Sequence, residues 1–155
     1  MSVIIETAQE QHLSAILALF TLSVNELTKQ DYTSEQRKAW TSSAKNQERW
    51  LQKIKDSHFL MACDNKELVG FASLENDQHF DFLYRHPNHP NKGIATLLAN
   101  AIEKCAVQKR MRQISVDSSE TALPFFTKRG YQMIRTQEIS RHGITLKNYH
   151  LLKVL

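Results

Sequence analysis

The sequence predicts an α/β fold of the α+β kind, with about seven strands and about four helices in one domain. Three observations predict it: an apolar stripe at helical spacing between Leu13 and Leu27, three strand-like runs between His58 and Arg85, and a second helical stripe between Ile94 and Cys105. The expected order is β-α-α-β-β-β-α-β-α-β-β. The 155 residues contain only four Gly and three Pro, too few for a linker rich in Gly or Pro. Residues 1–155 are therefore expected to form a single domain.

The first third of the chain is expected to be mainly helical. Residues 3–6 predict a short strand, and residues 13–27 an amphipathic helix. The polar stretch 32–55 carries Trp40, Trp50 and Ile54, and Ser34 with Arg37 makes a weak helix start. One or two short helices are expected there.

The middle of the chain alternates as strands do. Strands are predicted at 58–63, 68–74 and 80–85, with polar turns at 64–66 and 75–78. Such closely spaced strands form an antiparallel meander. A helix is then predicted at about 93–109, with its apolar face on the sheet.

The last third returns to strands. The pattern predicts a strand at 114–117, a helix at 121–128 closed by Gly130 as a left-handed cap, and strands near 132–140 and 145–153. Residues 141–143 join the last two strands as a tight turn.

Composition narrows the class of protein. The two cysteines, Cys63 and Cys105, are too far apart for a zinc ribbon or a redox pair, and Cys105 lies on the apolar helix stripe as a core residue would. Residues 1–10 lack a signal peptide's basic region, and no apolar run reaches the ~18 residues of a membrane span. We expect a cytoplasmic protein with no membrane partner. The net charge of +4 favours an anionic ligand.

The informative segment runs from Leu83 to Leu98, where a strand passes through a loop rich in Pro and Asn directly into a helix. Free amides and the dipole at such a helix start bind phosphate oxygens. Gly93 lets a ligand approach the backbone, and Lys92 adds charge. Alternatively, Gly93 only relaxes a turn and Pro90 only ends a strand.

The element order and two motifs resemble the GNAT superfamily of acetyl-CoA-dependent N-acetyltransferases. The family's signature is Gln/Arg-x-x-Gly-x-Gly/Ala after a strand that ends in x-x-Pro. Pro87 matches that Pro, and Gly93 and Ala95 match the small residues, whereas Pro90 and Asn91 depart from the pattern. The stretch 116–131 matches the family's later strand, helix and Gly-aromatic turn. Tyr32, residues 36–40 and Trp50 further resemble a bacterial branch of small GNAT proteins whose substrates are mostly unassigned.

The resemblance implies a central mixed, mostly antiparallel sheet in which two neighbouring parallel strands splay apart around the pantetheine arm of acetyl-CoA. Backbone groups of the first of these strands would bind that arm and polarise the thioester carbonyl. The residues expected to bind the cofactor are Leu83, Tyr84, Arg85, Asn91, Lys92, Gly93, Ile94, Ala95, Thr96, Ser119 and Phe126. Transfer would be direct, without a covalent enzyme intermediate.

The acceptor amine must lose a proton, and Asp81 and His79 are the candidate general bases, with Glu75 a weaker one. In a regular strand His79 and Asp81 share one face, and Phe80 and Phe82 the other. The alternative is that both polar residues only mark a solvated strand edge.

The usual general acid of the family, a Tyr that protonates the leaving thiolate, is replaced by Phe126. Tyr131 and Tyr149 are possible substitutes, although either hydroxyl can equally belong to a packing residue. A thiolate with a pKa of about 8.5 can also leave unaided.

For the acceptor, Tyr32, Trp40 and His79 are the expected contacts, because aromatic faces can bind an ammonium group. Tyr32, Trp40 and also Trp50 can instead be core residues. His86 and His89 lack further ligands at metal spacing, so no metal is expected. The basic run 109–112 is expected to be a solvated helix end, with a cofactor phosphate or RNA as the other options.

The sequence therefore predicts an N-acetyltransferase that moves acetyl from acetyl-CoA to a primary amine of a small molecule, peptide or protein, as a monomer or homodimer. The alternative is a silent acyl-CoA-binding sensor with the same fold. A basic nucleic-acid-binding protein is a weaker rival, because the sequence lacks a clustered basic and aromatic surface pattern, so no nucleic-acid partner is expected.

Overall fold

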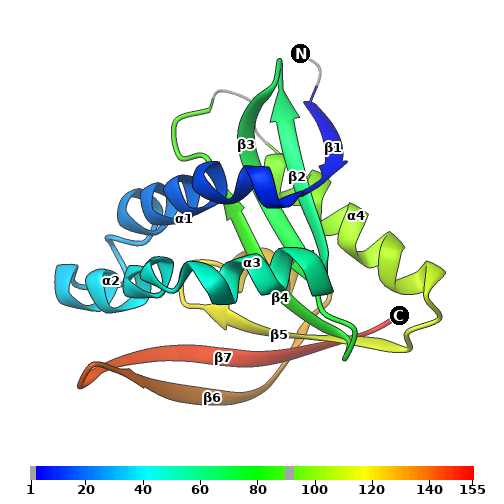
Figure 1. Cartoon of the computed structure of the whole chain (residues 1–155). Coiled ribbons are helices and arrows are strands. Elements are labelled where there is room, and N and C mark those ends of the chain that lie inside the picture. The colour runs from blue at the N-terminus through cyan, green and yellow to red at the C-terminus, as the bar shows by residue number, and fades with distance from the viewer. Residues whose placement is uncertain (1–2, 90–92) are drawn as a thin grey trace.

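The computed structural model describes residues 3–89 and 93–155. One seven-stranded sheet carries helices on both faces (Figure 1). The strands are β1 (Val3–Thr7), β2 (His58–Asp64), β3 (Glu67–Leu74), β4 (His79–Arg85), β5 (Gln113–Ser119), β6 (Gln132–Arg141) and β7 (Ile144–Val154). The helices are α1 (Leu13–Leu27), α2 (Ser34–Thr41), α3 (Gln47–Asp56), α4 (Ile94–Gln108) and α5 (Leu123–Lys128), with 3-10 turns η1 (Glu10–His12) and η2 (Ser42–Lys45).

The sheet has the order β1-β2-β3-β4-β5-β7-β6. All neighbouring strands pair antiparallel except β4 and β5, which are parallel. The predicted fold class and the mixed, mostly antiparallel sheet are thus confirmed. The region 32–55 forms both α2 and α3, so the helices number one more than expected.

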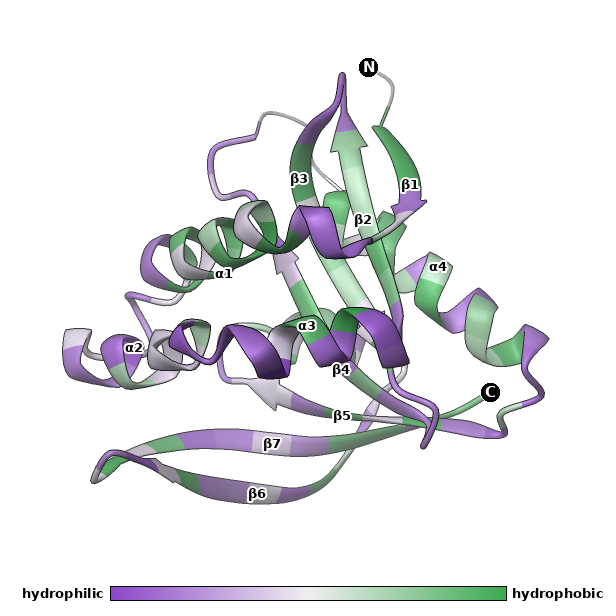
Figure 2. Ribbon diagram, viewed as in Figure 1, coloured by the Kyte–Doolittle hydropathy of each residue, from purple (hydrophilic) through white to green (hydrophobic). Residues whose placement is uncertain are grey.

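Two hydrophobic cores lie on opposite faces of the sheet. One core packs α4 and α5 on the sheet, and the other packs α1 and α3 on β2, β3 and β4. Successive residues of β3 supply both, because Phe71 points into the second core and Ala72 into the first. Because β2 and β3 are buried on both faces, their middle residues are apolar, whereas the turn that joins them and most of β6 are hydrophilic (Figure 2).

Local signals set several element ends. The cap of α2 is Thr33 rather than the expected Ser34, because Thr33 and Gln36 form a reciprocal capping box. Gly130 ends the segment after α5 with a φ of +93°, which confirms the predicted left-handed position. His142 and Gly143 both have positive φ, as the tight turn between β6 and β7 requires.

A β-bulge in the β3–β4 pair corrects one expectation. Ser73 faces Phe82 and Leu74 faces Phe80, so Asp81 is an extra residue in β4. As a result Phe80 belongs to the core under α4, whereas Phe82 packs against the core under α1 and α3. The expectation that Phe80 and Phe82 share a face is therefore wrong.

Among the described residues, none of the helices combines the length and the apolar character needed to cross a membrane.

Candidate functional site

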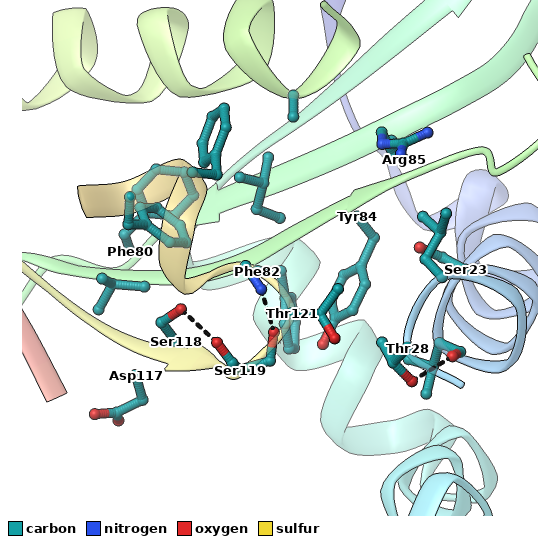
Figure 3. A pocket seen from close by; sticks show the side chains of 18 of the residues that line it. Ser23, Thr28, Phe80, Phe82, Tyr84, Arg85, Asp117, Ser118, Ser119 and Thr121 are labelled. Atoms are coloured by element: carbon teal, nitrogen blue, oxygen red, sulfur yellow. Dashed lines mark hydrogen bonds between the residues drawn. The ribbon is translucent and has the colours of Figure 1, made fainter. Parts of the chain in front are cut away.

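A cleft opens where β4 and β5 part. In the described chain these strands pair only at His79 with Ser115 and at Phe80 with Val116, although β4 continues to Arg85 and β5 to Ser119. The cleft has a volume of about 360 Å³ (Figure 3). Its walls are β4 residues 80–85, β5 residues 116–119, one face of α1, the first turn of α4, and Phe125 and Phe126 of α5.

The bulge sets which backbone amides face this cleft. The Phe82 N–H donates to Ser73 Oγ at 3.2 Å and the His86 N–H to the Val69 carbonyl at 2.8 Å, so both point toward β3. Because backbone groups alternate along a strand, the amides of Leu83 and Arg85 point toward the departing β5. They are placed to pair with an extended ligand instead of a strand.

The start of α4 lies at one end of the cleft. Gly93 precedes the helix with a φ of +102°, and a Cβ there would meet nothing within 4 Å. Ala95 lines the cleft, Ile94 is buried beneath it and Thr96 is exposed. The predicted contacts Asn91 and Lys92, and the departure at Pro90, lie outside the described residues. The open helix start suits an anionic group.

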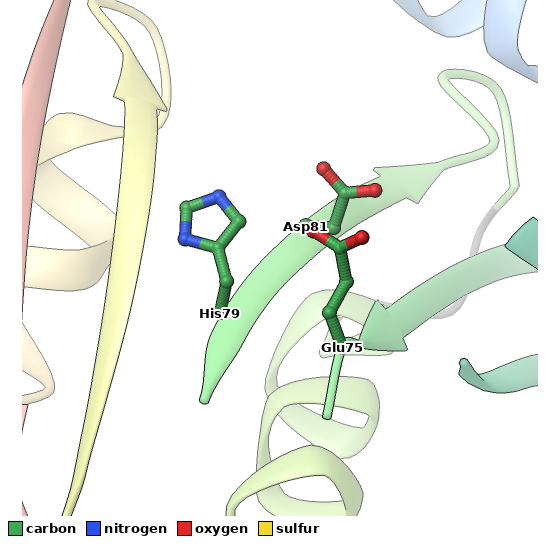
Figure 4. Close-up of side chains that lie close together, drawn as sticks. All are labelled: Glu75, His79 and Asp81. Atoms are coloured by element: carbon green, nitrogen blue, oxygen red, sulfur yellow. The ribbon is translucent and has the colours of Figure 1, made fainter. Parts of the chain in front are cut away.

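Three candidate bases gather at the end of β4 (Figure 4). Ligand atoms of Glu75, His79 and Asp81 lie within 4.8 Å of one another, so the two predicted bases do share one region. Lys53, from α3, places its Nζ 2.6 Å from Asp81 Oδ2 and 3.7 Å from Glu75 Oε2. This ammonium offsets one of the two negative charges in the group and pairs most closely with Asp81.

Asp81 and His79 differ in their surroundings. Asp81 lines the cleft, whereas His79 does not appear on its wall. His79 instead places Nδ1 2.9 Å from Ser115 Oγ and Nε2 3.6 Å from Asp117 Oδ2. The other oxygen of Asp117 lies 2.7 Å from His150 Nδ1. A histidine–carboxylate–histidine chain therefore crosses the sheet from β4 over β5 to β7, and its Asp117 lines the cleft.

The candidate acids are mostly engaged elsewhere. Phe126 is 2% exposed in the wall and has no hydroxyl. Tyr131 donates to Glu103 Oε2 at 2.9 Å, and burial raises the pKa of its phenol. Tyr149 donates to Glu120 over a long 3.4 Å.

The sequence interpretation missed the side chain of Tyr84, which was expected to contribute only its backbone. Tyr84 lines the cleft, and burial raises the pKa of its phenol despite a hydrogen bond from Trp40. The phenol therefore stays protonated over the physiological pH range and can donate.

Ser119 lines the cleft as expected, and its Oγ accepts the Ala122 N–H at 3.0 Å, which closes the turn into α5.

Of the expected acceptor contacts, Trp40 lines the cleft but Tyr32 lies behind it. Tyr32 is 5% exposed; its hydroxyl donates to the Lys147 carbonyl and accepts the Glu120 N–H, each at 2.8 Å. It joins segments 88 and 115 residues away along the chain. This geometry gives Tyr32 a positioning role rather than a surface for a ligand.

A second cavity adjoins the cleft and shares with it Trp40, Asp81, Phe82 and Tyr84. Its volume is about 140 Å³. The sequence interpretation did not single out its cations, Arg49, Lys53 and Arg141. They come from α3 and the end of β6, and no local pattern signals that these meet. The basic run 109–112, by contrast, lies beyond the far end of α4, whose 15 residues span roughly 22 Å.

Comparison with known proteins agrees with this geometry. The acetyltransferase (GNAT) domain profile matches residues 28–153. The chain is 27% identical over 147 residues to the uncharacterized N-acetyltransferase YafP of Escherichia coli strain K12, covering 95% of this chain and 93% of that protein.

Solved structures agree as well. A GCN5-related N-acetyltransferase from Rhodopseudomonas palustris, also described as a class-II aminotransferase, superimposes with a TM-score of 0.95 at 32% identity, covering 100% of this chain and 97% of the other. The PaiA N-acetyltransferase of Thermoplasma acidophilum, solved in complex with coenzyme A, shares the fold with a TM-score of 0.81 at 20% identity over 100% of both chains. The profile match and the 32% identity over the whole chain show that this protein belongs to the GNAT family and is an acyltransferase.

Proposed function

We propose that the protein transfers acetyl from acetyl-CoA to a primary amine by direct attack within a ternary complex. The observation that carries the proposal is the divergence of β4 from β5 after two residue pairs, which opens a cleft along free amides of β4 and ends it at the start of α4. The GNAT family uses acetyl-CoA as its acetyl donor, and this cleft suits such an extended, anionic molecule.

The chain's own residues have separable roles. The first turn of α4, at Gly93 and Ala95, would hold phosphate oxygens, while the Leu83 and Arg85 amides would pair with the pantetheine arm. A β4 amide directed at the thioester oxygen would stabilise the charge that develops during attack. Acetyl-CoA supplies the activated thioester. The amine nitrogen forms the new bond to the carbonyl carbon as the carbon–sulfur bond breaks.

Two protons have to move. Asp81 lies in the cleft wall, so it is the better placed acceptor for the amine proton, with His79 as the alternative. The leaving thiolate can take its proton from solvent, while the Tyr84 phenol, which lines the same cleft and stays protonated, can donate a hydrogen bond to the sulfur as its charge develops. Both roles are part of the proposal.

The test compares acetyl-CoA binding in matched variants. A ligand at about 100 times its Kd adds about 2.7 kcal/mol to the free energy of unfolding, so the wild-type melting temperature should rise clearly. Ala95→Glu places a carboxylate in the cleft, and Gly93→Glu does so at the helix start; both should abolish the rise. Gln108→Glu adds the same charge at the exposed far end of α4, so its melting temperature should still rise with acetyl-CoA.

Turnover is measured next as release of free CoA with a panel of primary amines that includes L-lysine, L-phenylalanine, 2-phenylethylamine and spermidine. CoA release that depends on the amine supports the proposal. A wild-type protein whose melting temperature does not respond to acetyl-CoA would refute it.

One observation favours a second function, that of a silent acyl-CoA sensor. The acid position is Phe126, and in the described chain the hydroxyls of Tyr131 and Tyr149 bond carboxylates of the fold. Acetyl-CoA binding without CoA release for any amine would establish this alternative.

A further inference from the structure

The second cavity lies beside the proposed point of transfer. It shares Trp40, Asp81, Phe82 and Tyr84 with the proposed acetyl-CoA cleft, so a molecule inside it lies next to Asp81 and next to that cleft. Its other lining residues are Phe20, Ser43, Arg49, Trp50, Lys53 and Arg141. We take this cavity, of about 140 Å³, as the acceptor site.

Aromatic side chains build its inner wall. The Trp50 ring stacks on Phe82 with centroids 4.5 Å apart, and Phe20 packs on both Trp50 and Tyr84. The Trp50 indole N–H donates to the Ser43 carbonyl, which fixes the ring. Phe20 and Trp50 are almost fully buried, so the aromatic surface that borders the cavity belongs mainly to the half-buried Trp40, Phe82 and Tyr84. This wall therefore suits one small apolar or aromatic group.

Cations surround the same cavity. Arg49, Lys53 and Arg141 line it, against the single carboxylate of Asp81. Lys53 is held by Asp81 at 2.6 Å, whereas the exposed guanidinium groups of Arg49 and Arg141 have no side-chain partner among residues 3–89 and 93–155. Paired guanidinium groups bind a carboxylate well, because their donors match its two oxygens.

From these features we infer that the acceptor is a primary amine that carries a carboxylate beside a small apolar or aromatic group, as an apolar amino acid does. The amine lies toward Asp81, the apolar group lies against the aromatic wall, and the carboxylate lies between Arg49 and Arg141. The inference rests on the proposed function and adds the substrate class.

The test uses product analogues, so that it does not depend on turnover or on amine ionisation. Binding of N-acetyl-L-phenylalanine and of N-acetyl-L-phenylalaninamide to the protein loaded with CoA is measured by calorimetry. The two probes differ only at the carboxylate. The acid should bind at least about 10-fold more tightly, which corresponds to about 1.4 kcal/mol.

Matched variants assign the effect to the two arginines. Arg49→Gln and Arg141→Gln should each reduce the preference for the acid, the double variant should abolish it, and Arg141→Lys should restore part of it. Arg135→Gln removes an exposed arginine of the same strand β6 that lines neither cavity, so it should leave the preference unchanged.

The outcomes separate the two proposals. If CoA binds but the acid and the amide bind equally, or neither binds, the inference is wrong and the acetyltransferase proposal stands. If neither CoA nor acetyl-CoA binds, the acetyltransferase proposal fails and the substrate inference fails with it. A preference for the acid that survives the double variant also overturns the assignment to Arg49 and Arg141.

Discussion

At the scale of single residues, the environment of Asp81 is the most consequential feature of the site. The bulge turns this residue out of the regular strand pattern, and Lys53 fixes its carboxylate at 2.6 Å. The Lys53 ammonium holds the Asp81 carboxylate in one orientation and lies 3.7 Å from the carboxylate of Glu75, so it also reduces the repulsion between the two negative charges. In the proposed reaction, this fixed carboxylate, which lines both cavities, receives the proton of the amine.

The first prediction separates Asp81 from His79 as the base. Asp81→Asn keeps the size of the side chain but removes its basicity, so kcat should fall by about 10²-fold or more while the Kd of acetyl-CoA stays unchanged. His79→Gln should cost less, because His79 does not line the cleft. Steady-state CoA release with the best amine of the panel, measured across pH, checks both. A larger loss in His79→Gln would reverse the assignment.

The sequence predicts several residues of this site but not the residues with which they form contacts. The sequence placed His79 and Asp81 together because two positions along one strand are close under any tertiary arrangement. The partner of Asp81, Lys53, is 28 residues away, and nothing in the polar stretch 47–56 distinguishes it from Lys55 or Arg49. Similarly, the sequence singles out Tyr32 as a candidate contact of the acceptor, but it gives no sign of the two backbone groups that its hydroxyl bonds, which lie in the last third of the chain.

At the scale of elements, the contact of α4 with β3 depends on one small residue. A Cβ on Gly70 would lie 2.7 Å from Ile94 Cγ2, 2.9 Å from Leu98 Cδ1 and 3.1 Å from the Tyr84 carbonyl oxygen. Gly70 therefore lets the first turns of α4 approach the sheet closely. This approach places the start of α4 at the end of the cleft.

The second prediction follows from that contact. Gly70→Ala should reduce the free energy of unfolding by about 1–3 kcal/mol, because the methyl group overpacks a close contact. It should also weaken acetyl-CoA binding by displacing the start of α4. Urea unfolding and calorimetry measure the two effects. Gly143→Asn is the control: an added Cβ there meets nothing within 4 Å, and Asn tolerates the positive φ, so a change within about 0.5 kcal/mol is expected.

The spacing of apolar residues in the sequence predicts most helices and strands, but it does not predict the β-bulge in β4. The apolar stripe of α4 and the alternation of β5 follow from burial of one face, and the apolar runs of β2 and β3 follow from burial of both faces. The bulge at Asp81 has no such signal, since no glycine marks it and its partner Ser73 lies on another strand. Yet this bulge decides which amides of β4 face the cleft.

At the scale of the whole molecule, the sheet consists of two parts joined weakly along its middle. In the described chain, strands β1 to β4 pair with strands β5 to β7 at only two positions, both between β4 and β5, next to which the Ser115 N–H donates to the Gln78 carbonyl at 3.0 Å. The core under α4 crosses this division, because it contains Val69 and Ala72 of β3 as well as Val116 and Leu151 of the other part. The cleft can therefore open without separating the two parts.

Glu103 of α4 strengthens this connection at the surface. It accepts hydrogen bonds from Arg129, Tyr131 and, at 3.0 Å, Lys153 of β7. The same helix packs on β2, β3 and β4, so the Glu103 contacts tie one part of the sheet to the other. Burial opposes the charge on Glu103, but the hydrogen bonds from its three partners outweigh it and lower the pKa of the carboxyl below 4.5.

The third prediction is that Glu103→Gln lowers the free energy of unfolding by about 2 kcal/mol near pH 7, because it removes charged hydrogen bonds from a largely buried position. A carboxyl whose pKa is lower in the folded state stabilises the fold above its unfolded value of 4.5, and this contribution disappears as the pH falls through the folded value. The difference between wild type and variant should therefore be complete at pH 7 and smaller at an acidic pH below 4.5, once the pH has fallen through the lowered folded value. Urea unfolding at both pH values measures it. Glu138→Gln, the control, removes an exposed carboxylate of β6 and should change the free energy of unfolding little at either pH. If Glu103→Gln lowers the free energy of unfolding equally at both pH values, the lost charge is not the cause.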